Sequence, residues 1–309
     1  MPSQHGPIVV GIGEILWDVF PDRRRPGGAP ANVAFHANQL GMHGIVYSRV
    51  GRDELGDELL AFLVQHGLQT DYVFRDAHYP TGQAEVSFND RGEPEFRFVP
   101  NVAWDHLDFH AAAETLMNSA AAVSFGTLAQ REEDARNAIH QCLAAVNSKT
   151  ITLYDANLRP PHVDREWIER SFAAARIVKV SEDEAKQIAS ILDWKQYDLQ
   201  HFAYHLRERY AVDLVCVTRG PRGCVLFAAN ETAEQAGVPL ETVDPVGAGD
   251  AFAAALLFAR LRSWSLTTTA DFANRYAALV ASRPGAMPRL EKELSELLQS
   301  FDALPPSTT

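Results

Sequence analysis

The chain of 309 residues is poor in cysteine, and its thiols are not spaced for disulfides or zinc. The three cysteines are Cys142, Cys216 and Cys224. Three is an odd number for a disulfide framework, and no pair has the C-x-x-C spacing of a zinc site. Because Cys216 lies in the apolar run Leu214–Val217, we expect it to be a buried thiol. This use of cysteine is typical of a protein in a reducing cytoplasm.

The sequence also lacks long hydrophobic runs and any excess of basic residues. No run approaches the ~20 apolar residues that span a bilayer, and the apolar run Ile8–Ile12 is too short for a signal peptide. We therefore expect no membrane partner. The 28 Lys and Arg residues stand against 40 Asp and Glu, a net charge of -12. This balance disfavours nucleic acid as a partner, because phosphates need basic patches.

Short apolar runs alternate with longer helical patterns along the chain. Runs such as Ala122–Phe125 lack strict alternation, which favours strands buried on both faces of a parallel sheet. Alternation of strands and helices predicts an α/β fold with helices on both faces. We predict strands at Ile8–Gly13, Ile45–Val50, Ala121–Phe125, Thr150–Tyr154, Ile177–Val180, Leu214–Thr218 and Cys224–Ala228. Helices are predicted at Ala31–Gln39, Leu55–Gln65, Glu132–Ala145, Glu182–Ile191, Leu199–Arg209, Asp250–Leu261 and Ala270–Ser282.

One segment departs from this alternation of strands and helices. Gln83–Phe88 and Glu95–Val99 each alternate polar and apolar residues, and Asn89–Pro94 between them has strong turn chemistry. The pattern predicts an antiparallel hairpin, which Tyr72–Phe74 could extend into a small sheet that covers a site. An ordinary edge hairpin is the alternative interpretation.

The strongest local signal for chemistry lies in Thr242–Phe252, where Gly247 and Gly249 flank Ala248. Small residues at a helix start let backbone N–H groups approach an anion closely, and the helix dipole favours negative charge there. Asp250 follows at once. Taken alone, this acid could equally be one that complements the helix dipole.

The segment from Asp244 to Phe252 closely resembles the second signature of the ribokinase/PfkB family of sugar kinases. The first signature of that family is similar to Gly27–Ala34, which Leu40-Gly41 follows. The two signatures lie far apart and in the family's order. Further elements of the family pattern resemble Gly51–Gly56, Tyr154–Arg159, Val217–Gly223 and Gly285–Pro288. The resemblance spans nearly the whole chain, and it is strongest to the fructokinase branch.

This resemblance implies a ribokinase-like three-layer α/β/α fold, with a central, mostly parallel sheet and a small β-sheet lid. Residues 1–309 would form one domain, with the lid inserted at about 14–30 and 71–102. The implied reaction transfers the γ-phosphoryl group of ATP to a sugar hydroxyl, with D-fructose and its O6 as the expected acceptor.

Other functions are weighed against this one. A kinase of 2-keto-3-deoxygluconate or another sugar acid is the first alternative, and a catalytically silent sugar-binding regulator is the second. A nucleoside kinase is less favoured, because no aromatic pair is clearly placed to sandwich a base. A nicotinamide oxidoreductase is disfavoured, because Gly11-Ile12-Gly13 lacks the third glycine of a dinucleotide fingerprint.

The resemblance also assigns roles to residues. Asp250 would be the catalytic base, and the N–H groups of Gly247, Ala248 and Gly249 would form an anion hole for the transferred phosphoryl group. The residues expected to contact the sugar are Asp18, Gly27, Gly28, Asn32, Asn157 and Arg159. Those expected near ATP are Thr218, Gly220, Gly223 and Asn274.

The same resemblance implies Mg²⁺ and bears on K⁺. Mg²⁺ would bridge the ATP phosphates, held largely through water. Glu184 keeps the place of the acid that orders those waters, although Ser181 stands where the family has asparagine. A need for K⁺ is left open, with Asp244 as the candidate contact, as in relatives that need a monovalent cation. Many relatives dimerise through their lids, and the sequence leaves a homodimer open.

Overall fold

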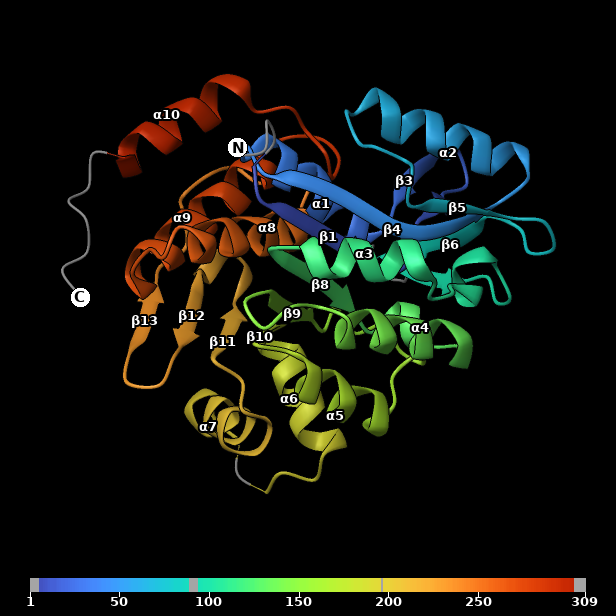
Figure 1. The fold of residues 1–309 in the computed structure, drawn as a ribbon. Coiled ribbons are helices and arrows are strands. Elements are labelled where there is room, and N and C mark those ends of the chain that lie inside the picture. Colours follow the sequence, from blue (N-terminus) through green and yellow to red (C-terminus); the bar gives the residue numbers. More distant parts are fainter. Residues whose placement is uncertain (1–5, 89–93, 196, 303–309) are drawn as a thin grey trace.

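A large, mostly parallel sheet forms the centre of the computed structural model, which describes residues 6–88, 94–195 and 197–302 (Figure 1). Its strand order is β13-β12-β11-β10-β9-β8-β1-β4-β5. The pairs from β5 to β11 are parallel, and β12 and β13 are added antiparallel at one edge. The bounds are β1 Ile8–Ile12, β4 His43–Gly51, β5 Val73–Asp76, β8 Ala122–Gly126, β9 Ile151–Asp155, β10 Ile177–Ser181, β11 Leu214–Thr218, β12 Cys224–Phe227 and β13 Thr232–Gln235.

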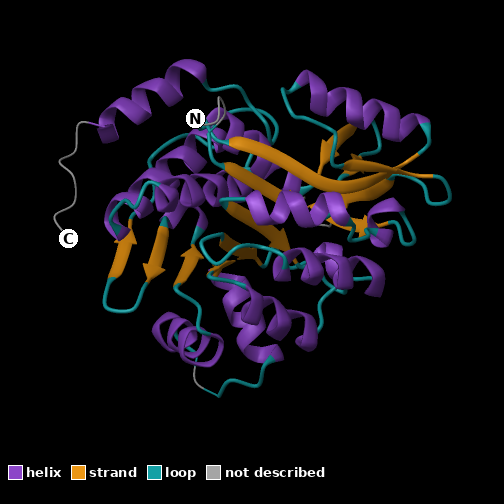
Figure 2. Ribbon diagram, in the orientation of Figure 1, coloured by secondary structure: helices purple, strands orange, loops and turns teal. Residues whose placement is uncertain are grey.

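Helices cover both faces of this sheet, as Figure 2 shows. Successive side chains of a strand point to opposite faces, so Val10 packs into the cluster under α3 to α7 while Val9 packs into the cluster under α1, α8, α9 and α10. The predicted α/β layering is therefore confirmed. The helices are α1 Ala29–Gln39, α2 Glu54–Gln65, α3 Ala111–Ser119, α4 Glu133–Ala144, α5 Arg165–Ala174, α6 Glu182–Ile191, α7 Leu199–Tyr210, α8 Ala248–Leu261, α9 Leu266–Ala281 and α10 Glu291–Asp302. Within the described ranges, none of the helices is both long and apolar enough to cross a bilayer.

Helix α8 is buried along almost its whole length, between the sheet and its neighbours α1 and α9. Its run Ala253–Ala255 is fully buried, since small side chains let the surrounding elements approach closely. Gly247 precedes the helix with a left-handed backbone, φ 80°. This packing fixes the first turn of α8, and Asp250 with it.

A second, four-stranded sheet has the order β3-β2-β6-β7. Its strands are β2 Leu16–Val19, β3 Arg24–Gly27, β6 Gly82–Phe88 and β7 Pro94–Phe98. The antiparallel pairing of β6 with β7 confirms the predicted hairpin, while residues 89–93 of the predicted turn lie outside the described residues. We call this four-stranded sheet the lid.

The prediction that Tyr72–Phe74 joins the lid is wrong. Val73–Asp76 instead forms β5, which pairs in parallel with Ser48–Gly51 of β4 at the edge of the large sheet. Val73 is buried there, and the Phe74 ring packs against the edge of Tyr47, with 5.7 Å between ring centroids. Apolar contacts with the main body therefore decide which sheet this strand joins.

Candidate active site

A pocket of about 480 Å³ lies between the lid and the carboxyl ends of the parallel strands. This is where open α/β sheets bind their ligands. Among the predicted site residues, the pocket wall includes Asp18, Gly27, Gly28, Asn32, Asn157, Arg159, Glu184, Thr218, Gly247, Gly249 and Asp250. Its described wall does not include Ala248, Gly220, Gly223, Asn274 or Asp244.

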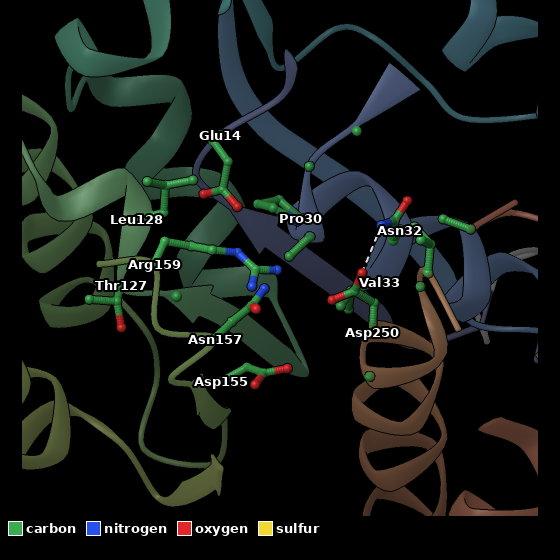
Figure 3. A pocket seen from close by; sticks show the side chains of 18 of the residues that line it. Glu14, Pro30, Asn32, Val33, Thr127, Leu128, Asp155, Asn157, Arg159 and Asp250 are labelled. Atoms are coloured by element: carbon green, nitrogen blue, oxygen red, sulfur yellow. Dashed lines mark hydrogen bonds between the residues drawn. The ribbon is translucent and has the colours of Figure 1, made fainter. Parts of the chain in front are cut away.

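Asp250 stands at one side of the pocket, in the first turn of α8. Figure 3 shows it facing Asn32 of α1, whose Nδ2 donates a hydrogen bond of 2.7 Å to Asp250 Oδ2. Burial raises the pKa of Asp250 to about 6, the charge of Asp155 adds to the rise, and the Asn32 hydrogen bond opposes it. A carboxylate with a pKa this close to neutral is suited to proton transfer.

Asn32 has a second feature that bears on ligand binding. Its Oδ1 is buried and has no hydrogen-bond partner among the described residues. A buried polar atom without a partner is costly, and this one belongs to a residue of the pocket wall. A hydroxyl donor on a bound ligand would satisfy it.

The glycines before Asp250 shape the wall beside the helix start. A Cβ on Gly247 would lie 2.6 Å from both the Cα and the Cβ of Ala286, so no side chain fits there. The backbone N–H groups of the first helical turn have no partner within a helix, which suits an anion. The Ala248 N–H, however, donates to the carbonyl of Pro245 at 3.2 Å.

Asp18 and Gly27 meet in the lid part of the pocket. Asp18 lies opposite Arg25 in the β2–β3 pairing, and a Cβ on Gly27 would come within 2.7 Å of Asp18 Oδ2. Burial raises the pKa of Asp18 to about 6, and the charges of Arg159 and Arg25 oppose the rise. The glycine leaves the carboxylate room to face the pocket.

Asn157 and Arg159 follow the end of β9 and lie across the pocket from Asp250 (Figure 3). Asn157 has a left-handed backbone, φ 38°, a conformation that asparagine tolerates better than most residues. The guanidinium of Arg159 lies over the Phe96 ring, 5.7 Å from its centroid. Phe96 and Phe98 of β7 both line the pocket, so the lid closes it with aromatic surface.

Three charged residues of the pocket wall, Glu14, Asp155 and Lys179, were not predicted as site residues from the sequence. Glu14 follows β1 and is almost fully buried, and burial raises its pKa to about 7. Lys179 in β10 donates to Asp155 Oδ2 at 2.7 Å, and both residues are buried. A charged residue inside the apolar run Ile177–Val180 was the signal that could have revealed Lys179.

Glu184 and Ser181 form a capping box at the start of α6. The Ser181 Oγ accepts from the Glu184 N–H at 3.2 Å, and Glu184 Oε2 accepts from the Ser181 N–H at 2.7 Å. Glu184 Oε1 accepts from the Leu158 N–H at 2.7 Å. Serine therefore acts as the N-cap where the family has asparagine, and Glu184 ties α6 to the loop after β9.

The residues predicted near ATP divide into two groups. Thr218 lies in the pocket wall. Gly223 shapes the turn between β11 and β12, where a Cβ would lie 1.9 Å from the carbonyl oxygen of Gln235, and Gly220 in the same turn has φ 56°. Asn274 donates to the carbonyl of Ala236 at 2.8 Å. The last three residues hold the loops beside the pocket.

Asp244 lies outside the described pocket wall and has three hydrogen-bond donors. Its Oδ2 accepts from Arg25 Nη1 at 3.1 Å and from the Gly285 N–H at 3.0 Å. Its Oδ1 accepts from the Val246 N–H at 3.1 Å. The carboxylate thus connects the lid, the loop before α8 and the turn after α9.

Comparisons with known proteins place the chain among carbohydrate kinases. Residues 15–293 match the family model described as pfkB family carbohydrate kinase. Fructokinase-1 of Oryza sativa subsp. japonica is 31% identical, over 95% of this chain and 98% of that protein. A structure of fructokinase with bound ATP from Xylella fastidiosa has a TM-score of 0.83 at 22% identity, covering 95% of this chain and 99% of the other. An uncharacterized sugar kinase from Pyrococcus horikoshii in complex with ATP has a TM-score of 0.80 at 26% identity, covering 96% and 100%.

Proposed function

The chain belongs to the pfkB family of carbohydrate kinases, and from this premise we propose that it phosphorylates D-fructose at O6. It is an ATP-dependent, fructokinase-like sugar kinase, a phosphotransferase with a hydroxyl acceptor. The choice of fructose, the roles of the individual residues and the metal ion are the content of the proposal.

The pair formed by Asp250 and Asn32 is the observation that carries this proposal. The 2.7 Å hydrogen bond from Asn32 fixes one oxygen of the Asp250 carboxylate, while Asn32 Oδ1 lacks a partner among the described residues. A polyol placed against this pair donates one hydroxyl to Asp250 and a neighbouring hydroxyl to Asn32 Oδ1. The arrangement supports a hydroxyl acceptor at the start of α8.

In the proposed reaction, Asp250 takes the proton of the primary alcohol as the alcohol oxygen bonds to the γ-phosphorus of ATP. The bond between that phosphorus and the β–γ bridging oxygen breaks, and ADP leaves with the electron pair. The N–H groups of Gly247 and Gly249 and the positive end of the helix dipole stabilise charge on the transferred group. Lys179 adds positive charge beside the transferred group, since its Nζ lies 3.5 Å from the point that a Cβ on Gly249 would occupy.

The charge of the pocket favours a neutral sugar over a sugar acid. Arg159 is one of only two basic side chains in the described wall. It lies near the carboxyl groups of Asp18 and Glu14, where its charge opposes the rise in pKa that burial causes. An acceptor carboxylate would compete with them for this guanidinium and meet their repulsion. The acids of the wall are Glu14, Asp18, Asp155, Glu184 and Asp250, and its bases are Arg159 and Lys179.

Mg²⁺ fits the proposal as a companion of ATP. No group of three or more metal-ligating side chains occurs among the described residues, which suits an ion held by phosphates and water. Glu184 lies in the pocket wall, and its oxygens have room to accept from metal-bound water beside their backbone donors. When bound, Mg²⁺ neutralises phosphate charge. K⁺ at Asp244 is not part of the proposal, because the guanidinium of Arg25 already pairs with that carboxylate.

Three further properties of the protein belong to the proposal. They are the lid boundaries at 14–30 and 71–102, a homodimer through the lid, and a cytoplasmic location. Sedimentation at several protein concentrations measures the oligomeric state. All three cysteines are free and buried in the structure, which supports a reducing compartment.

The acceptor is tested by coupled release of ADP with Mg-ATP. The panel contains fructose, ribose, 2-keto-3-deoxygluconate, adenosine and inositols. We expect the highest kcat/KM with fructose, and phosphorus coupling in the NMR spectrum of the product should locate the new ester at O6. A higher kcat/KM with 2-keto-3-deoxygluconate would replace fructose by the sugar acid. Turnover of none of these acceptors would contradict the fructose assignment.

A substitution in the lid tests direct contact with the sugar. Asp18→Ala is expected to raise the KM for fructose by roughly 10- to 100-fold, the effect of losing charge-assisted hydrogen bonds, and to leave the KM for ATP within about twofold. Asp22→Ala, an exposed acid of the same hairpin, is the control and should change neither constant. Equal effects of Asp18→Ala on both KM values would refute the contact.

A further inference from the structure

One ion pair joins the lid to the loop that leads into α8. Arg25 lies in β3, and its Nη1 is 3.1 Å from Asp244 Oδ2, with 41% of the arginine side chain and 14% of the aspartate side chain exposed. The two residues are 219 positions apart in the sequence. Arg25 also lies opposite Asp18 in the β2–β3 pairing. The guanidinium therefore stands between the acceptor side of the pocket and the loop that holds Gly247.

The Asp244 carboxylate organises that loop. It accepts from the N–H of Val246, the residue before Gly247, and from the N–H of Gly285 after α9. The Asp244 N–H in turn donates to the carbonyl of Ala281 at 3.0 Å. A nearby positive charge offsets the cost of placing a carboxylate in a largely buried position. In this structure Arg25 supplies that charge.

The oxygen atoms around Asp244 do not fit a bound K⁺. Asp244 Oδ2 already accepts two hydrogen bonds, from Arg25 and from the Gly285 N–H, and Oδ1 accepts one from the Val246 N–H. Of the nearby carbonyls, that of Ala281 accepts from two backbone N–H groups, and that of Ala286 lies 2.9 Å from His36 Nε2. The guanidinium would also repel a second cation at the same carboxylate. The Arg25 guanidinium thus supplies the positive charge beside Asp244, and the two donors on Oδ2 fill the hydrogen-bonding capacity of that oxygen.

We propose that the Arg25 guanidinium is the built-in counter-ion of Asp244, in the place that a monovalent cation would take, so that phosphoryl transfer does not need K⁺. Arg25 is then a positioning residue, which acts on the loop before α8 through Asp244. The proposal rests on the kinase activity, but not on the identity of the acceptor.

Exchange of cations tests this in the wild type and in Arg25→Gln. At constant ionic strength, wild-type turnover should stay within about twofold when K⁺ replaces Li⁺. Arg25→Gln should lose about tenfold or more of kcat in Li⁺, the effect of one charge-assisted hydrogen bond, and should regain most of it in K⁺. Arg25→Lys should keep activity in both salts. Arg24→Gln is the matched control, because Arg24 is the neighbouring residue of β3 and pairs with Glu58 outside the pocket.

Thermal unfolding gives a readout that does not depend on turnover. K⁺ should raise the Tm of Arg25→Gln above its value in Li⁺, because an ion that binds only the folded state stabilises it. The wild type and Arg24→Gln should show no such difference. Wild-type turnover stimulated severalfold by K⁺ would overturn the proposal, and so would an Arg25→Gln variant that shows no response to K⁺ in either measurement. If no acceptor on the panel turns over, the fructose assignment fails while the Tm comparison still decides the role of Arg25.

Discussion

Asp250→Asn is expected to fold like the wild type and to lose about 10²- to 10⁴-fold in kcat, the usual contribution of a positioned general base. Asparagine has nearly the same volume and keeps a carbonyl oxygen that can accept from Asn32 Nδ2, so the 2.7 Å hydrogen bond at the start of α8 can persist. It cannot take the proton of the acceptor. Steady-state turnover measures the loss, while calorimetric titration with ATP and the Tm should stay close to the wild type.

The pH dependence of kcat distinguishes a catalytic base at Asp250 from an acid that only complements the helix dipole. Burial raises the pKa of Asp250 to about 6, and below that pH the carboxyl group is protonated and cannot accept a proton. Wild-type kcat should therefore fall as the pH drops through 6, and the residual activity of Asp250→Asn should lack this limb. Glu114→Gln removes an acid from the first turn of α3 and should change turnover at no pH. Near wild-type turnover of Asp250→Asn would remove Asp250 from the base role.

Gly247→Ala is expected to lower kcat by about 10²- to 10³-fold, the effect of disturbing a donor that stabilises charge in the transition state. The backbone at this position has φ 80°, and the new Cβ would lie 2.6 Å from the Cα of Ala286. The loop before α8 must shift to relieve this contact, and the N–H groups shift with it. Because Asp18 and Asn32 lie on other elements, sugar binding measured by calorimetry should change little.

Gly67→Ala is the matched control for this substitution. Gly67 follows α2 with nearly the same left-handed backbone, φ 78°, and a Cβ there would meet no atom within 4 Å. Its substitution costs about 1 kcal/mol of backbone strain and should leave kcat unchanged. If both variants kept wild-type turnover, the Gly247 N–H would have no part in transfer.

The sequence predicted the strands and helices that are buried by continuous apolar runs, such as β8 and α8. Its local pattern did not reveal β2 and β3, although the family resemblance placed part of the lid at about 14–30. The sequence of β3, Arg24-Arg25-Pro26-Gly27, lacks the alternation and the β-branched residues of a typical strand, and its strand conformation depends on pairing with β2. Helices α3, α5 and α10 were missed as well. Short or edge elements of this kind depend on tertiary pairing more than on local pattern.

Within the site, sequence motifs located the start of α8 and the loops that face it, because each motif is a local stretch of chain. Charge pairs between distant segments could not be found in this way. Lys179 lies directly opposite Asp155 in the pairing of β10 with β9, a register that neither strand encodes alone. Arg25 and Asp244 meet only once the lid sits on the main body.

The chain path through the lid has a consequence for folding. Strand β2 pairs in parallel with β6, with Leu16 opposite Gly82, and the intervening chain forms α1, β4, α2 and β5, which pack on the main body. Closing so long a loop costs entropy before the new contacts repay it. We therefore expect the large sheet to gather this chain before β2 and β6 meet. On this expectation the lid side of the pocket forms late, after the sheet beneath it.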